Sequence, residues 1–300
     1  MDIISQNRTW INLASRSYVP TYGHGYLESK YYEETFEYIW LAFLTIWSVI
    51  VIYYVVGGVM YAFLSTVPVQ VCEPQRALFV IAHPDDECMF FGPTILQLLK
   101  NHTVYLLCLS TGDYFNQGLE RKSELWRSCQ VLGISPSNIT LMDIMDMRDD
   151  PSEWWSYRKT TQIILDQVER LSINKVFSFD PAGVSGHRNH SSIFYALGNM
   201  CVNNHMPPYC KAYMLESVNV VRKYSAFFDA AISSFNNHKF VVSWWDTRKI
   251  QEAMREHHTQ LKWFRKIYIF VSRYMYINTY KELDKDDVQL CLQMYDGPIL

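Results

Sequence analysis

The chain has 300 residues, of which 49% are hydrophobic and 19% are charged, and its formal net charge is −3 at pH 7. This balance, with no long run of Lys or Arg, argues against a nucleic-acid-binding protein. The seven cysteines include no Cys-x-x-Cys pair, so neither a disulfide scaffold nor a cysteine zinc site is indicated.

The N-terminal part contains a long uncharged segment. Residues 1–37 are polar and aromatic without clear periodicity, and we interpret them as a tail. No charged residue lies between Glu37 and Glu73. Because a helix needs about 20 apolar residues to cross a bilayer, we predict a single transmembrane helix over residues 38–68. The alternatives are a buried helix of a soluble protein and a cleaved signal peptide, and the length and late start of the segment disfavour both.

Two features bear on the orientation of this span. Arg8, Arg16 and Lys30 precede it and Arg76 follows it, so the distribution of positive charge does not place the C-terminal side in the cytosol. The sequon that begins at Asn189 lies inside a candidate metal motif, where a glycan would block chemistry. We therefore expect the C-terminal domain to face the cytosol.

Short apolar runs alternate with segments of helical periodicity from Gln75 onward. The predicted strands are Ala77–Ala82, Thr103–Leu109, Ile139–Met142 and Lys175–Phe179. The predicted helices are Pro93–Lys100, Glu120–Leu132, Trp154–Leu171 and Ser191–Asn203. This alternation predicts an α/β fold over residues 75–300, with a Rossmann-like, mostly parallel sheet and helices on both faces.

Polar clusters follow the predicted strands, at the edge where such sheets bind ligands. His83, Asp85, Asp86 and Glu87 come directly after the first strand. Three neighbouring acids repel one another unless a positive charge lies among them, and a divalent cation would supply it. The alternative is a solvated loop whose acids cap a helix.

A second cluster follows the fourth strand and begins at Asp180. His187 and His190 are three residues apart, so they share a face at the start of a helix. With the first cluster they offer His83, Asp86 and His190 as metal ligands. Two histidines and one carboxylate, with a position left for water, form a known catalytic zinc arrangement. Iron(II) takes a similar set, so another divalent cation stays open.

Five ordered segments resemble those of the de-N-acetylases of N-acetylglucosaminyl-phosphatidylinositol. That family acts at the second step of glycosylphosphatidylinositol anchor synthesis, within a superfamily of zinc-dependent, LmbE-like sugar deacetylases. The segments are AHPDDE at 82–87, STGDYFNQG at 110–118 with ERKSEL at 120–125, DIMDMRDDP at 143–151, GVSGHRNH at 183–190, and QLKWFRKIYIFVSRYMYIN at 260–278. The resemblance runs from about Ala77 to the end of the chain, and the single N-terminal span is similar too.

The resemblance implies a catalytic role for each residue of the two clusters. His83, Asp86 and His190 would bind Zn²⁺. Asp85 would be the general base that takes a proton from the attacking water. His187 would stabilise the developing oxyanion or pass a proton to the amine.

Substrate contacts are also implied. Arg121 resembles the family's sugar- or phosphate-facing arginine, with a helix-surface position as the alternative. Asp146 would bind sugar hydroxyls, with Asp143 as the rival. His257 resembles a histidine of an H-x-[ST]-Q segment in the family, and Asp180 would orient one of the imidazoles by accepting a hydrogen bond from its N–H.

The stretch Trp263–Ile277 is aromatic and basic, and is typical either of a lipid-interface segment or of a buried helix. The leading hypothesis is an anchored hydrolase of the endoplasmic reticulum membrane that removes acetate from N-acetylglucosaminyl-phosphatidylinositol. The alternatives are a de-N-acetylase of a soluble N-acetylglucosamine conjugate and a non-catalytic membrane scaffold with the same fold. The glycolipid and the membrane are the expected partners, and no obligate protein partner is inferred.

Overall fold

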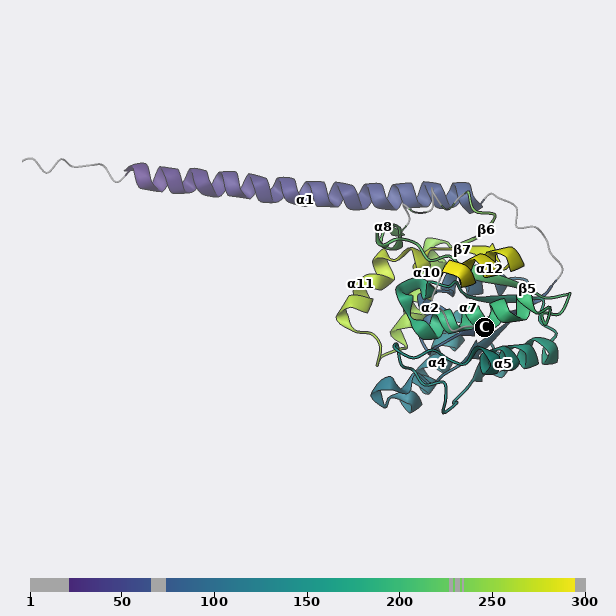
Figure 1. Ribbon diagram of the computed structural model, residues 1–300. Coiled ribbons are helices and arrows are strands. Elements are labelled where there is room, and N and C mark those ends of the chain that lie inside the picture. Colours follow the sequence, from purple (N-terminus) through teal and green to yellow (C-terminus); the bar gives the residue numbers. More distant parts are fainter. Residues whose placement is uncertain (1–21, 66–73, 227–228, 230–232, 234, 295–300) are drawn as a thin grey trace, which may run out of the picture. The chain divides into compact units, whose positions relative to one another are not determined.

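The computed structural model describes residues 22–65, 74–226, 229, 233 and 235–294 (Figure 1). The chain divides into an N-terminal unit, Met1–Val55, and a C-terminal unit, Val56–Leu300.

A single long helix, α1, runs from Tyr22 to Ser65. It begins inside the segment that the sequence analysis interpreted as a tail, and residues 1–21 and 66–68 lie outside the described residues. Thr35–Val59 is long and apolar enough to cross a membrane, with a mean hydropathy of 2.3. None of the side chains in its most apolar stretch is buried among the described residues.

One seven-stranded sheet, in the order β3-β2-β1-β4-β5-β7-β6, forms the centre of the C-terminal unit. Its strands are β1 (Arg76–Ile81), β2 (Thr103–Cys108), β3 (Ile139–Leu141), β4 (Lys175–Phe179), β5 (Lys211–Leu215), β6 (His238–Val241) and β7 (Ile277–Glu282). Strands β1 to β5 pair in parallel, whereas β7 pairs antiparallel with both β5 and β6. The predicted mostly parallel sheet is confirmed, and its four predicted strands are β1 to β4. The parallel strand β5 and the antiparallel strands β6 and β7 were not predicted.

Helices cover both faces of the sheet, as predicted. Those that pack together on one face are α3 (Gly92–Leu98), α4 (Gly118–Leu132) and α10 (Trp244–Arg255). Those on the other face are α5 (Tyr157–Arg170), α7 (Arg188–Val202) and α12 (Lys285–Met294). Connections between parallel strands are right-handed, so the direction in which the chain moves along the sheet decides which face a helix covers. From β1 to β3 the chain moves in one direction, and from β3 to β5 it moves in the other, so the helices of these two parts cover opposite faces. The shorter helices are α2 (Asp86–Met89), α6 (Gly183–Gly186), α8 (Val220–Lys223), α11 (Trp263–Val271), η1 (Asp113–Phe115), η2 (Pro136–Asn138) and η4 (Arg273–Met275).

The core lies on the two central strands. Every residue of β1 after Arg76 is buried, because helices cover both faces of a parallel sheet. Phe79 of β1 stacks on Phe177 of β4 with 5.1 Å between ring centroids. The strand order reverses between β1 and β4, and open α/β sheets bind ligands in the crevice beyond such a reversal.

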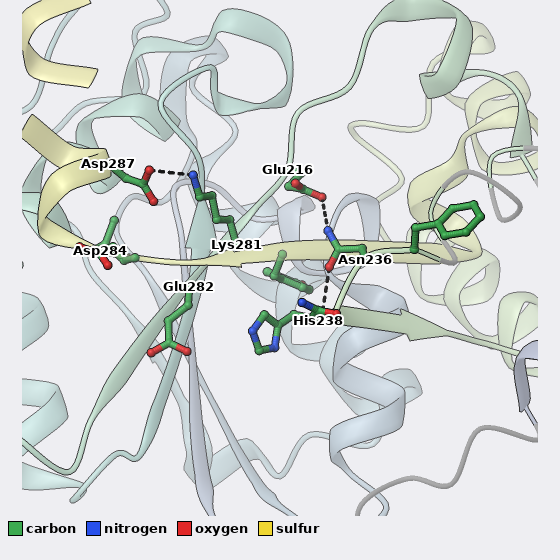
Figure 2. A pocket seen from close by; sticks show the side chains of 11 residues that line it. Glu216, Asn236, His238, Lys281, Glu282, Asp284 and Asp287 are labelled. Carbon is green, nitrogen blue, oxygen red and sulfur yellow. Dashed lines mark hydrogen bonds and ion pairs between the residues drawn. The ribbon is translucent and has the colours of Figure 1, made fainter. Parts of the chain in front are cut away.

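A cavity of about 510 Å³ lies beside β6 and β7 (Figure 2). Its polar side chains pair with one another. Lys281 Nζ donates to Asp287 at 2.8 Å, and Asn236 Nδ2 donates to Glu216 at 2.7 Å. None of the groups of metal-ligating side chains in the described residues lies in it.

Candidate active site

A larger cavity, of about 650 Å³, opens at the carboxyl ends of the parallel strands. The segments that follow β1, β2, β3, β4 and β5 all contribute to its wall, and α11 closes one side. Here the structure brings together most of the residues that the sequence analysis selected.

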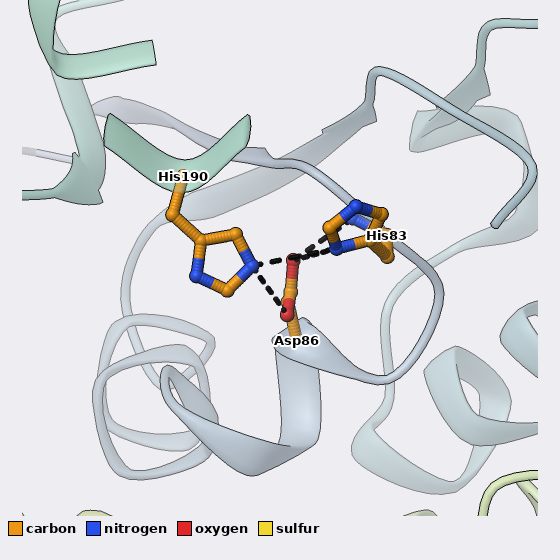
Figure 3. A group of neighbouring side chains, drawn as sticks. All are labelled: His83, Asp86 and His190. Atoms are coloured by element: carbon orange, nitrogen blue, oxygen red, sulfur yellow. Dashed lines mark hydrogen bonds and ion pairs between the residues drawn. The ribbon is translucent and has the colours of Figure 1, made fainter. Parts of the chain in front are cut away.

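Three potential metal ligands from two segments point toward one another (Figure 3). His190 Nε2 lies 3.4 Å from Asp86 Oδ1 and 3.4 Å from His83 Nδ1. His83 Nδ1 lies 3.8 Å from Asp86 Oδ2. Ligand atoms placed tetrahedrally about 2.0–2.2 Å from a zinc ion lie roughly 3.3–3.6 Å apart, so these spacings fit a metal.

The chain around Asp86 holds its carboxylate in place. Oδ2 accepts hydrogen bonds from the backbone amides of Ala82 at 3.0 Å and His83 at 2.9 Å, which leaves Oδ1 facing His190. Burial favours the neutral acid, but the imidazoles of His190 and His83 outweigh burial and lower the pKa of Asp86 below its ordinary value. The carboxylate is therefore ionised and ready to bind a cation.

His190 is fixed by two contacts. Its Nδ1 lies 3.0 Å from the Gly183 carbonyl oxygen and donates to it, which directs Nε2 toward Asp86 and His83. Its ring stacks on Phe179 with 4.0 Å between centroids. Gly183 has a φ of +56°, and a Cβ there would come within 2.9 Å of the His190 Cβ. Position 183 therefore needs glycine for the ring to sit as it does.

His83 is held from the opposite side. Its Nε2 lies 3.0 Å from Asp149 Oδ1 and 3.1 Å from the side-chain amide of Asn189. The hydrogen bond with His83 lowers the pKa of Asp149, against the opposing effect of burial. An imidazole that donates one N–H to a carboxylate presents its other nitrogen to a metal. A second potential ligand group, made of His83, Asp149 and His187, overlaps the first.

Asp85 has an unusual backbone conformation. Its φ of 114° lies in the left-handed region that a residue with a side chain seldom adopts. The Asp85 amide donates to Glu87 Oε2 at 3.0 Å, which holds this turn. Asp85 Oδ2 lies 2.5 Å from Arg265 Nη1 and 3.7 Å from Arg121 Nη2. Strained residues of this kind cluster at functional sites.

His257 does not line the cavity, which corrects the expectation that it contacts substrate. Its side chain has no exposed surface, and its Nε2 lies 2.7 Å from Glu87 Oε1. Ser128 donates to the same oxygen at 2.5 Å. Glu87 in turn accepts a hydrogen bond from the Asp85 amide, so His257 supports the turn at Asp85 through Glu87.

Arg121 lies in the cavity wall, in a buried position rather than on the helix surface. Its Nη2 donates to the Pro84 carbonyl at 2.7 Å, and its Nη1 donates to the Gly112 carbonyl at 2.8 Å. Its Nη1 also lies 3.2 Å from Asp149 Oδ2. Gly112 permits this approach, because a Cβ there would lie 2.4 Å from the guanidinium carbon.

Two further expectations are corrected by the structure. Asp146 is exposed and pairs with Lys159 at 2.9 Å, outside the cavity wall. Its rival Asp143 is also exposed and outside that wall. Asp180 accepts from Ser217 Oγ at 2.6 Å and from the Gly183 amide at 3.0 Å, rather than from an imidazole. It positions the loop whose Gly183 carbonyl holds His190.

His187 lies against the ligand cluster. Its ring centroid is 4.8 Å from that of His83 and 4.8 Å from that of His190. Burial, assisted by these two imidazoles, lowers the pKa of His187 to about 4. Its Nδ1 is buried and has no hydrogen-bond partner among the described residues, which leaves that atom available to a bound group.

Two residues of the site were not selected from the sequence. Asp149 belongs to the segment at 143–151, but the choice there fell on Asp146. Arg265 belongs to the aromatic and basic stretch, which was assigned to a lipid interface or a buried helix. The sequence shows several acids in residues 143–151 and an arginine in the stretch Trp263–Ile277. Only the fold shows that Asp149 and Arg265 are the ones that reach the cavity.

The sequence is similar to those of known proteins. Residues 78–201 match the model of the PIG-L family, described as GlcNAc-PI de-N-acetylase. The N-acetylglucosaminyl-phosphatidylinositol de-N-acetylase of Bos taurus is 43% identical over 207 residues, covering 68% of this chain and 82% of the relative. A probable enzyme of the same name from Schizosaccharomyces pombe is 35% identical, covering 69% of this chain and 86% of the relative.

The fold is also shared with a solved structure. The N,N'-diacetylchitobiose deacetylase of Pyrococcus horikoshii has a TM-score of 0.51 at 16% identity, covering 80% of this chain and 93% of that one. Because that identity is low, it supports the fold alone. On the strength of its sequence relatives, the chain belongs to the N-acetylglucosaminyl-phosphatidylinositol de-N-acetylase family and is a deacetylase.

Proposed function

We propose that this deacetylase hydrolyses the acetamide of N-acetylglucosaminyl-phosphatidylinositol, giving glucosaminyl-phosphatidylinositol and acetate in the second step of glycosylphosphatidylinositol anchor synthesis. The observation that carries the proposal is the meeting of His83, Asp86 and His190 beside Asp85 in one cavity. The names of its relatives supply the substrate.

His83, Asp86 and His190 would hold the metal, and their two nitrogens and one oxygen favour Zn²⁺, with Fe²⁺ as the second choice. When bound, the ion supplies Lewis acidity and makes a water acidic enough to react near neutral pH. Asp149 and Gly183 orient the two imidazoles through the nitrogens that face away from the ion.

Asp85 is the general base. It takes a proton as the water oxygen forms a bond to the acetyl carbonyl carbon. Asp86 is unsuited to this task, because its oxygens are committed to backbone amides and to the metal site. The carbon–nitrogen bond then breaks, the proton that Asp85 took from the water passes to the nitrogen, and acetate and the free amine leave.

His187 is placed to assist that step. As a neutral imidazole it donates a hydrogen bond to the negative charge that develops on the carbonyl oxygen, or it relays to the departing amine the proton that Asp85 took. Its proximity to His83 and His190 and its unpartnered Nδ1 support this role.

Arg121 and Asp149 would contact the polar part of the substrate. Both line the cavity. Three contacts to protein oxygens fix the Arg121 guanidinium, and its Nε has no partner among the described residues. The guanidinium has five N–H donors, so two are left beyond these three contacts for a sugar or phosphate oxygen.

The membrane location rests on helix α1. We place the chain in the endoplasmic reticulum membrane, spanning it once, with the catalytic unit in the cytosol. The candidate span Thr35–Val59 supports anchoring beside a lipid substrate. Asn189 of the sequon has no exposed surface and contacts His83, so it is poorly suited to carry a glycan.

The test compares the wild type with Asp85→Asn. Acetate release is measured from the glycolipid in vesicles and from a soluble N-acetylglucosamine conjugate, and bound metal is measured on the same preparations. We expect release from the glycolipid by the wild type, and retained metal with abolished turnover in the variant. Full activity of Asp85→Asn would reject the base assignment, and release from the soluble conjugate alone would reject the substrate.

A further inference from the structure

The mouth of the active-site cavity carries apolar side chains that the domain leaves exposed. They come from three elements far apart in the sequence, and each is at least half exposed. We call this set the rim, and its members are Phe115, Val221, Trp263, Phe264, Ile267 and Phe270. Soluble domains seldom gather so many large apolar groups in one place unless something covers them.

The rim is continuous with the cavity. Phe115, Phe264 and Ile267 form part of the cavity wall as well as the exposed surface. Lys223 also lines the wall, and it lies two residues after Val221 in α8, so α8 is at the same opening. Helices α8 and α11 lie at one edge of the domain (Figure 1). Whatever covers the rim therefore also faces the entrance to the site.

Helix α11 supplies most of this surface. Trp263, Ile267 and Phe270 recur at helical spacing and share an exposed stripe. The opposite side is anchored, because Ile269 is buried and the Tyr268 hydroxyl donates to the Met89 carbonyl at 3.0 Å. The stripe is thus held outward by a rigid attachment.

Charge on α11 complements an anionic surface. Lys262 caps the helix and Lys266 lies one turn further on, and both are exposed. Tryptophan and phenylalanine between lysines are typical of helices that lie in the lipid interface, where the rings enter the headgroup layer and the ammonium groups meet phosphate. A protein partner would not require this pairing of rings with lysines.

We propose that the rim is a membrane-docking surface that seats the cavity mouth on a phospholipid bilayer. This inference rests on the proposed function, because only a substrate with acyl chains in the bilayer needs its headgroup delivered at the lipid surface. Docking lets the sugar enter the site while the chains stay in the membrane. It acts in addition to any anchoring by α1, since a span alone does not orient the mouth.

The first test measures contact with lipid. The full chain is reconstituted in phosphatidylcholine vesicles, with and without phosphatidylinositol, in which the acyl chains are brominated to quench nearby indoles. The difference in fluorescence between wild type and Trp263→Phe isolates Trp263 from the other tryptophans. Trp245→Phe is the matched control, because Trp245 is as exposed (73% against 74%) but lies outside the rim. It lies in the first turn of α10, about 15 Å along that helix from its last residue, Arg255.

We expect strong quenching of Trp263 and little of Trp245. Lys262→Glu with Lys266→Glu should reduce the Trp263 quenching, and more so in vesicles that contain phosphatidylinositol. Equal quenching of the two indoles would overturn the proposal.

The second test separates docking from catalysis. The double variant Trp263→Ser with Phe270→Ser removes two rim residues that do not line the cavity. The control is Tyr209→Ser, because Tyr209 is similarly exposed but lies just before β5, at the amino ends of the strands and not at the carboxyl ends where the cavity opens. The rim variant should lose about tenfold or more activity on the glycolipid in vesicles and keep its activity on a water-soluble, chain-free analogue. That retained activity also shows that the variant folds.

Equal losses on both substrates would overturn the proposal. So would self-association of the wild type in detergent that the rim variant lacks, since this would assign the rim to a second copy of the chain. If the wild type releases acetate from neither substrate, the proposed function fails, while the quenching of Trp263 still decides whether the rim meets lipid.

Discussion

Arg265 Nη1 lies 2.5 Å from Asp85 Oδ2, although the two residues are 180 positions apart in the chain. The same nitrogen lies 3.2 Å from the Gln260 carbonyl oxygen. Helix α11 is thereby tied to the residue that we assign as general base. The same short helix holds the base on one side and presents the rim on the other.

Removal of this guanidinium should impair turnover without loss of metal. Arg265→Gln takes a charged partner from a buried carboxylate, and hydrogen bonds to charged groups contribute about 1.5–3 kcal/mol. We expect acetate release to fall about 10–100-fold, with smaller losses in Arg265→Lys, which keeps the charge but not the planar fork. Unchanged turnover in Arg265→Gln would show that Asp85 needs no such partner.

Asp86 and Asp149 belong to the two overlapping ligand groups, and their variants distinguish between them. If Asp86 is the ligand, Asp86→Asn should abolish metal binding. Asp149→Asn should only weaken binding by about 10–100-fold, because Asp149 orients His83 from behind. Metal titration of the two purified variants checks this order. The reverse order would place the ion between His83, Asp149 and His187.

His187 should matter for turnover and not for metal retention. Loss of one group that stabilises a developing oxyanion typically costs about 10²–10³ in rate. We expect that loss in His187→Ala, with bound metal at the wild-type level. Ser185→Ala, a neighbouring change in the same cavity wall, is the control and should remain active. Metal loss in His187→Ala would instead make His187 a ligand.

The buried pair of His257 and Glu87 should make stability depend on pH. Glu87 raises the pKa of His257 above 6.5 although burial opposes this, and the imidazole lowers the pKa of Glu87 below 4.5. A raised histidine pKa stabilises the fold at low pH, and this contribution is lost as pH rises through the folded-state pKa. A lowered glutamate pKa stabilises it above 4.5, and this contribution is lost as pH falls through the folded-state pKa. The pair therefore contributes most between pH 4.5 and 6.5.

His257→Leu should lower the free energy of unfolding by about 3–5 kcal/mol, because it leaves Glu87 buried and unpaired. Urea unfolding of the detergent-solubilised chain measures this, and the gap to wild type should narrow as pH is raised above that window. His257→Gln, which can still donate to Glu87, should lose less. A gap that widens toward alkaline pH would refute the pairing.

Four of the seven strands and the candidate metal ligands could be predicted from the sequence for a physical reason. Buried parallel strands are short apolar runs, and the residues that follow them converge at one edge of the sheet. That reasoning located β1 to β4 and brought His83, Asp86 and His190 to one place. Strands β5, β6 and β7 were not predicted, and the places of β6 and β7 in the sheet reflect the antiparallel pairing of β7 with both β5 and β6 rather than a local pattern.

Individual roles within a segment were harder to predict. Asp146 and Asp149 lie three residues apart in the same loop, yet one pairs with Lys159 at the surface and the other with His83. His257 matches the H-x-[ST]-Q pattern of the family, but this pattern does not predict that the histidine is buried and paired with Glu87. Arg265 reaches Asp85 only because α11 folds back over the cavity. Such contacts depend on side-chain direction in the assembled fold.

Metal removal and replacement test the central claim most directly. Acetate release from N-acetylglucosaminyl-phosphatidylinositol is measured for the purified chain as prepared, after removal of metal by a chelator, and after addition of Zn²⁺. We predict that the prepared chain binds one metal ion, that release stops when it is removed, and that zinc restores it in the wild type but not in Asp86→Asn. Full release by the metal-free chain would contradict the account.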